Sequence, residues 1–100
     1  MTYEFHPAAE QEYADAAHWY EDQVEGLGGR FAAAIGQAVM SILKEPGRFQ
    51  HLGDGLRVFR LNRWPYKLYY GYDQGGSHIR IVCVMHQKRQ PEYWMERLRR

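Results

Sequence analysis

The spacing of apolar residues changes near the middle of the chain, and this change constrains the fold more than any other feature. In the first half, apolar side chains such as Ala9, Tyr13, Ala16 and Tyr20 recur every three or four residues, which is the period of an amphipathic α-helix. In the second half, apolar and polar side chains alternate, which is the period of a β-strand. The chain therefore predicts a helical first half and a β-sheet second half.

The helical half is expected to contain two helices, at residues 7–23 and 31–43. Pro7 can occupy the first turn of a helix, where its missing N–H costs nothing. The sequence GLGG at residues 26–29 is expected to end the first helix, and the Pro-Gly pair at residues 46–47 is expected to end the second. Because the connection is so short, the two helices should form an antiparallel hairpin.

The sheet half is expected to contain three strands, at Leu56–Leu61, Tyr66–Tyr72 and His78–His86. They are separated by the sequences NRWP and DQGG, and the latter is a strong hairpin signal. The three strands therefore predict an antiparallel meander. A short strand at residues 2–6, TYEFH, should join the same sheet, whereas the glycine- and proline-punctuated residues 46–55 are interpreted as a loop.

The order of these elements predicts an α+β fold. The β-α-α-β-β-β plan places an N-terminal α-helical hairpin on one face of a small, mostly antiparallel four-stranded sheet. Pro91 is expected to open a short C-terminal helix. A chain of 100 residues has the size of one ordinary domain, so residues 1–100 are expected to form a single domain.

Composition indicates a cytoplasmic protein that uses neither a metal nor another cofactor. The only cysteine, Cys83, cannot form a disulfide within the chain and suits a reducing compartment. No apolar N-terminal leader and no uncharged apolar run of about 18 residues is found, so neither secretion nor membrane spanning is expected. The histidines lack the spacing of metal ligands.

Charge is unevenly distributed along the chain, although the formal net charge is only +1. Acidic residues concentrate in the first half, and ten of the 13 lysines and arginines lie from Arg57 onward. A basic second half can attract nucleic acid, an acidic peptide or an acidic protein surface. The charge distribution alone does not distinguish among these three kinds of partner.

Alternation along the strands predicts which face of the sheet each side chain occupies. In the last strand, one wholly apolar set should face the helices; its members are Ile79, Ile81, Cys83 and Met85. Arg80 and His86 have the opposite parity and are expected on the open face. In the middle strand, Lys67 and Tyr69 should lie on that same open face.

The predicted open face is a candidate anion site. Strand 56–61 contributes Arg57 or Arg60, which have opposite parity, so the sequence does not decide which of them faces the open side. Arginine offers a planar fork of donors for phosphate or carboxylate, and Tyr69 or His86 can transfer a proton. The alternative is that these residues are the solvated face of an ordinary antiparallel sheet, with His86 bonded to the backbone at a strand end.

Five strings of the sequence, in order across nearly the whole chain, resemble the ParE-type branch of the RelE/ParE superfamily of type II toxins, often labelled plasmid stabilisation proteins. They are FHPAAEQEYADAAHWYEDQ, GLGGRFAAAI, ILKEPGRF, LRVFRLNRWPYKLYY and VMHQKRQPEYW. The resemblance implies a small toxin with the β-α-α-β-β-β plan. It also implies a hetero-oligomeric complex with a cognate antitoxin, whose acidic or amphipathic C-terminal segment folds around the toxin.

Two activities divide this superfamily: ParE-like members poison DNA gyrase, and RelE-like members cleave mRNA in the ribosome without a metal. The HQKRQPEYW ending is similar to that of ParE-like members, and a net charge of +1 is small for a protein that docks on ribosomal RNA. Gyrase poisoning is therefore favoured. The alternatives are the ribosome-dependent endoribonuclease and an antitoxin-binding module that has lost toxicity.

The resemblance implies roles for residues of the basic strands, although it identifies no firm catalytic residue. A ribonuclease would use basic and proton-transferring groups of the open face, namely Arg57, Arg60, Tyr69, Arg80 and His86. Contact with the target or the antitoxin would involve the residues Arg57, Arg60, Lys67, Arg80, His86 and Arg89.

Overall fold

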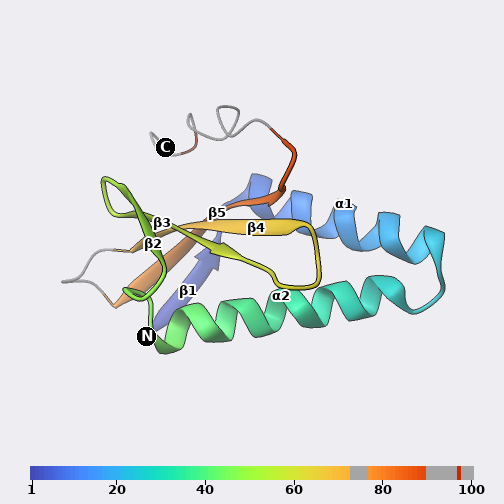
Figure 1. The fold of residues 1–100 in the computed structure, drawn as a ribbon, viewed down its shortest axis with the longest axis horizontal. Coiled ribbons are helices and arrows are strands. Elements are labelled where there is room, and N and C mark those ends of the chain that lie inside the picture. The colour runs from blue at the N-terminus through green and yellow to red at the C-terminus, as the bar shows by residue number, and fades with distance from the viewer. Residues whose placement is uncertain (73–76, 90–96, 98–100) are drawn as a thin grey trace.

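The structure, a computed structural model, describes residues 1–72, 77–89 and 97. Its elements are β1 (Thr2–Phe5), α1 (Pro7–Gln23), α2 (Leu27–Lys44), β2 (Gln50–Gly53), β3 (Leu56–Arg60), β4 (Tyr66–Tyr72) and β5 (His78–His86). The two helices form a hairpin that lies along one side of the sheet (Figure 1). This arrangement confirms the predicted α+β fold. The turn expected at DQGG and the helix expected from Pro91 lie outside the described residues.

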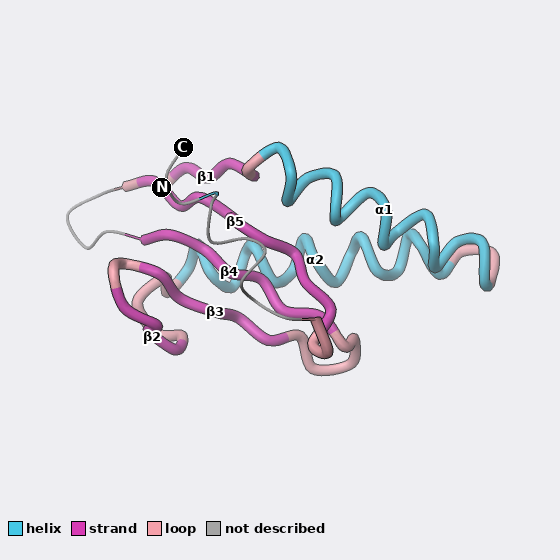
Figure 2. Tube along the Cα trace, turned by 90° about the horizontal axis from the view of Figure 1, so that it is seen from above, coloured by secondary structure: helices cyan, strands magenta, loops and turns pink. Residues whose placement is uncertain are grey.

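The sheet has five strands in the order β1-β5-β4-β3-β2, which can be followed in Figure 2. β1 is parallel to β5, and every other pair of neighbours is antiparallel. The expectation of four strands is wrong by one, because β2 lies in the segment interpreted as a loop. β2 is short and polar. A turn in which Gly53, Asp54 and Gly55 all have positive φ connects it to β3, with which it pairs.

The GLGG sequence both ends α1 and begins α2, so α2 starts four residues earlier than predicted. Gly26 has a φ of 86°, in the left-handed region that glycine adopts readily. Gly28 lies against α1, where a Cβ atom would be 2.4 Å from the Ala17 carbonyl oxygen. The Glu21 carboxylate accepts the N–H groups of Gly26 and Gly28 at 2.8 and 3.0 Å, and these bonds lower its pKa. These contacts fix the two helices close together.

The larger core, here called the helix-side core, lies between the helical hairpin and the sheet. It contains wholly buried side chains of α2, β4 and β5: Phe31, Ile35, Ile42, Leu68, Tyr70, Ile79 and Ile81. The Tyr70 hydroxyl donates a 2.6 Å hydrogen bond to the Pro46 carbonyl oxygen, and burial raises the pKa of Tyr70 to about 12. This bond ties the loop after α2 to the centre of the sheet.

A second buried cluster, here called the outer cluster, contains no residue of either helix. Its members are Leu56, Val58, Tyr69, Val82, Cys83 and Met85. Leu56 and Val58 of β3, Tyr69 of β4 and the three β5 residues of the cluster lie on the face of the sheet away from the helices. Thus both faces of the sheet bury apolar side chains, and the outer face is not the solvated polar surface considered above.

A β-bulge in β5 changes the side chains that face the helices. Tyr69 pairs with Cys83 and Tyr70 pairs with Ile81, which leaves Val82 without a partner in β4. Residues before the bulge keep the predicted parity, but Cys83 and Met85 lie in the outer cluster and not in the helix-side core. The prediction that these two side chains face the helices is therefore wrong.

Candidate partner-binding site

Arg60 and Lys67 form a pair of cations on the outer face of the sheet. They lie directly opposite each other on β3 and β4. The Lys67 ammonium lies 5.6 Å from the centre of the Tyr69 ring, and Arg60 donates a 2.7 Å hydrogen bond to the Gln50 side chain. Like charges that face each other across a ladder repel, so an anion bound between them would relieve that repulsion.

Arg80 also lies on the outer face, on β5, which pairs with the edge strand β1. It alternates with Ile79 and Ile81, whose side chains lie in the helix-side core. Its guanidinium is 3.8 Å from the Glu4 carboxylate of β1, which is also 3.2 Å from His78. Because Glu4 already offers Arg80 a negative charge, Arg80 is less available to an external anion than Arg60 is.

Arg57 lies on the helix-facing side of β3. It alternates with Leu56 and Val58 of the outer cluster, and it stands opposite Tyr70 of the helix-side core. Its guanidinium donates a 2.7 Å hydrogen bond to the Phe49 carbonyl oxygen. The question left open by the sequence is therefore resolved: Arg60 faces outward, and Arg57 supports the loop after α2.

His86 lies on the helix-facing side as well, contrary to the prediction. Its ring makes an edge contact with Tyr66, with the centroids 5.3 Å apart, and its Nδ1 atom accepts the Lys88 N–H at 3.1 Å. His86 and Arg89 line a small hollow of about 250 Å³ against α1, beside Trp19. The bulge at Val82 is the reason, because it shifts the parity of every later residue in β5.

The five candidate ribonuclease residues are thus divided between two faces of the sheet. Arg60, Tyr69 and Arg80 belong to the outer face, whereas Arg57 and His86 belong to the helix-facing side. Arg57 and Arg80 nevertheless both line one open hollow of about 750 Å³, whereas Arg60, Tyr69 and His86 do not line it. A general acid or base must come within hydrogen-bond reach of the reacting proton, and the structure does not bring all five candidates together around one point. Among the described residues no group of three metal-ligating side chains is found, and no described helix is long and apolar enough to cross a bilayer.

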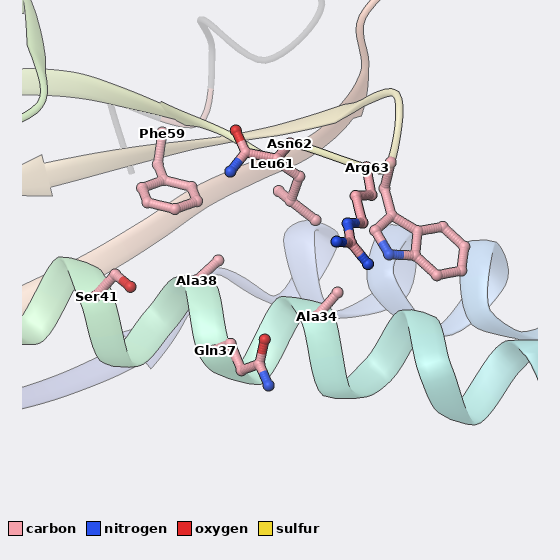
Figure 3. Close-up of a pocket in the computed structure, with 9 residues that line it drawn as sticks. Ala34, Gln37, Ala38, Ser41, Phe59, Leu61, Asn62 and Arg63 are labelled. Atoms are coloured by element: carbon pink, nitrogen blue, oxygen red, sulfur yellow. The ribbon is translucent and has the colours of Figure 1, made fainter.

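A groove that the sequence did not reveal runs between α2 and the chain leaving β3 (Figure 3). Its hollow has a volume of about 360 Å³. α2 supplies Ala34, Ala38 and Ser41, and the opposite wall includes Phe59 and Leu61. The spacing of Ala34 and Ala38 along α2 is the available sequence signal, but the same spacing also fits an ordinary buried helix face.

The fold is similar to those of two solved structures. The crystal structure of the isolated E. coli RelE toxin superimposes with a TM-score of 0.65 at 15% identity, covering 98% of this chain and 96% of that chain. The chromosomal ParDE toxin-antitoxin system from P. aeruginosa matches with a TM-score of 0.59 at 18% identity, covering 86% of this chain and 95% of that one. No curated protein sequence matches the chain.

The family model for the ParE toxin of the type II toxin-antitoxin system parDE matches residues 3–91. The chain therefore belongs to the ParE toxin family. This agrees with the resemblance found in the sequence.

Proposed function

We propose that this ParE-type toxin acts on DNA gyrase by binding and without catalysing a reaction itself. The observation that carries the proposal is the division of the candidate acid, base and cationic groups between two faces of the sheet. Phosphodiester cleavage by the protein would need these groups to converge on one phosphate. A binding toxin has no such requirement, and gyrase, its proposed target, is a cytoplasmic enzyme.

The proposed second partner is a cognate antitoxin with an acidic or amphipathic C-terminal segment. Arg60 and Lys67 favour such a segment, because they oppose each other on the outer face and the side-chain hydrogen bond of Arg60 goes to a neutral amide. A segment that orders on binding can cover a large surface and bring its carboxylates to this pair. Arg80 lies on the same face, nearer β1.

A supercoiling assay tests the proposed target. The purified chain, added to gyrase with relaxed plasmid and ATP, should stop supercoiling and trap cleaved plasmid, while primer extension on mRNA from expressing cells should show no new 5′ ends. Intact supercoiling with new 5′ ends would support the ribosome-dependent endoribonuclease, for which the RelE-like fold is the supporting observation. Neither effect, together with a tight antitoxin complex, would indicate a non-toxic antitoxin-binding module.

The same assays applied to a protein carrying Arg60→Glu and Lys67→Glu separate the two roles of the cation pair. Loss of gyrase inhibition would assign the pair to the target. Loss of neutralisation by the antitoxin would assign it to the antitoxin. Retention of both would remove these residues from either interface.

A further inference from the structure

The open hollow that Arg57 and Arg80 line lies at one end of the sheet, and its volume is about 750 Å³. At this end β3 begins, β4 ends and β5 begins, so side chains from both faces of the sheet can line it. Gly71 of β4 also lines the hollow, four residues from Lys67, which is about 13 Å along a strand. The hollow is therefore separate from the pair formed by Arg60 and Lys67.

Gly71 leaves space in the middle of this hollow. Leu56, Gly71 and Arg80 lie in one row across β3, β4 and β5. A Cβ atom on Gly71 would meet only the Arg80 carbonyl oxygen, at 4.0 Å, so a side chain would have room there. Because glycine has no side chain, that room is left to a ligand.

The two arginines lie close enough to hold one anion together. β3 and β5 are separated only by β4, so their backbones are about 10 Å apart. Two extended arginine side chains can close this distance from opposite sides. The planar fork of donors on each guanidinium matches the oxygens of a phosphate group.

The charge of Arg57 lacks an anionic partner. Arg57 is half-buried, and its guanidinium donates to the neutral Phe49 carbonyl oxygen. Among the residues that the structure describes, its Nε atom is buried without a hydrogen-bond partner, and the side chain forms no ion pair with a carboxylate. A cation withdrawn from water is costly unless an anion accompanies it. An anion in the hollow would lower that cost.

The two histidines of the hollow differ in what they can offer a ligand. Both ring nitrogens of His78 already have partners, because Nδ1 lies 2.7 Å from the Thr2 hydroxyl and Nε2 lies 3.2 Å from the Glu4 carboxylate. The His51 ring is exposed on β2 and lines the hollow. His51 can therefore donate an N–H to an anion, whereas His78 holds β1 against β5.

Two carboxylates limit what the hollow attracts from a distance. Asp54 lines it, and Glu4 lies 3.8 Å from the Arg80 guanidinium. That distance is longer than a hydrogen bond, so Arg80 retains donors for a ligand. Because the acids reduce the long-range positive potential, binding depends on short hydrogen bonds from the arginines. This favours a compact anion over an extended polyanion.

We propose that this hollow is a binding site for a phosphate group, held between Arg57 and Arg80 with His51 as a further donor. The group is inorganic phosphate or the terminal phosphate of a nucleotide, which share this chemistry. The volume of the hollow lies within the range of small-molecule sites, about 300–1,000 Å³. The inference goes beyond the proposed function, because it involves neither gyrase nor an antitoxin.

Isothermal titration calorimetry on the full chain, in phosphate-free buffer at near-physiological salt, tests the site. The probes are inorganic phosphate, ATP and a short single-stranded oligonucleotide without a terminal phosphate. Binding of phosphate and ATP supports the site. Tighter binding of ATP identifies a nucleotide as the source, and equal affinities identify the phosphate group alone. Binding of the oligonucleotide only, or of none of the three probes, would overturn the proposal.

A pair of variants with the same change in charge locates the binding. Arg80→Gln should weaken the binding of phosphate and of ATP about tenfold, because it removes one guanidinium from the hollow. Arg30→Gln is the control, since Arg30 is exposed in α2 and does not line the hollow, and it should change the affinities less than about twofold. Equal losses in the two variants would show that the ions bind by net charge and not at this site.

A neutral substitution tests the hollow by filling it. Gly71→Val places a β-branched side chain where a Cβ atom has room, so the melting temperature should not fall, while the binding of phosphate and ATP should weaken at least about tenfold. A folded Gly71→Val protein with wild-type affinity would place the anion elsewhere. If this variant does not fold, the comparison of Arg80→Gln with Arg30→Gln still decides.

Discussion

Single buried polar atoms do much to hold the loops of this protein in place. Tyr70 is wholly buried in the middle of the sheet, yet its hydroxyl reaches the carbonyl oxygen of Pro46 in the loop that follows α2. A buried hydroxyl without a partner is costly, so this hydrogen bond and the path of the loop depend on each other. Arg57 acts similarly on the same loop through the Phe49 carbonyl oxygen.

Replacing Tyr70 by phenylalanine tests this bond. Tyr70→Phe should lower the free energy of unfolding by about 1–2 kcal/mol, because it leaves the buried Pro46 carbonyl oxygen without its donor. Urea denaturation at neutral pH measures the change. Tyr3→Phe is the matched control, because Tyr3 is 47% exposed and the same atom is removed; equal effects of the two substitutions would contradict the argument.

Urea denaturation repeated at alkaline pH tests the pKa of Tyr70, which is raised from 10.0 to about 12 in the folded protein. Folding favours the neutral phenol, so its contribution is fully present below pH 10 and is lost as the pH rises toward 12. The wild-type protein should therefore lose stability more steeply in this window than Tyr70→Phe does.

At the scale of elements, the helical hairpin depends on a close approach between α1 and α2. Gly28 makes that approach possible, because a Cβ atom there would be 2.4 Å from the Ala17 carbonyl oxygen and 2.9 Å from the Cβ of Glu21. The nearest obstacle is backbone, which cannot rotate away. Glu21 then holds the start of α2 by accepting the N–H groups of Gly26, which precedes the helix, and of Gly28, in its first turn.

Two glycine substitutions in α2 should have opposite effects. Gly28→Ala should lower the free energy of unfolding by about 1–3 kcal/mol, since α1 and α2 must move apart. Gly36→Ala, at an exposed position of the same helix with nothing within 4 Å of the added methyl group, should raise it by about 0.5–1 kcal/mol. Thermal and urea unfolding measure both. A Gly28→Ala protein as stable as Gly36→Ala would disprove the close contact.

At the scale of the whole molecule, one carboxylate joins three distant parts of the chain. Glu12 of α1 accepts the Val84 N–H of β5 at 3.1 Å and forms two hydrogen bonds with Arg97, at 2.9 and 3.0 Å. Arg97 also donates to the Val82 carbonyl oxygen, within the bulge. The side chains of Glu12 and Arg97 are only 18% and 14% exposed, so little solvent screening weakens this pair.

Removal of Glu12 should therefore destabilise the fold more than removal of an exposed acid. Glu12→Ala removes the carboxylate that pairs with Arg97 and accepts the Val84 N–H, and it should cost about 2–4 kcal/mol. Glu4→Ala breaks the exposed contact with Arg80 and should cost less than about 1 kcal/mol. Equilibrium unfolding in urea compares the two variants, and equal losses would show that Glu12 has no special role.

Local periodicity was sufficient for most of the secondary structure. α1, β4 and β5 have the predicted bounds, and β3 differs by one residue, because the apolar residues that each element buries lie within its own sequence. β2 was missed because its residues are mostly exposed and show no alternation of apolar and polar side chains. Its hydrogen-bonded pairing with β3 makes it a strand. The groove was missed because it is formed by elements far apart in the sequence.

The sequence by itself determined the family, the layer order and the parity of β4. The bulge at Val82, and with it the faces of Cys83, Met85 and His86, was decided only by the tertiary structure. The physical reason is that the bulge lies where Glu12 accepts the N–H of Val84, a residue 72 positions away in the chain. The alternation of side chains within β5 carries no information about this contact with α1. A prediction of facing that is based on alternation is therefore wrong for the residues after the bulge.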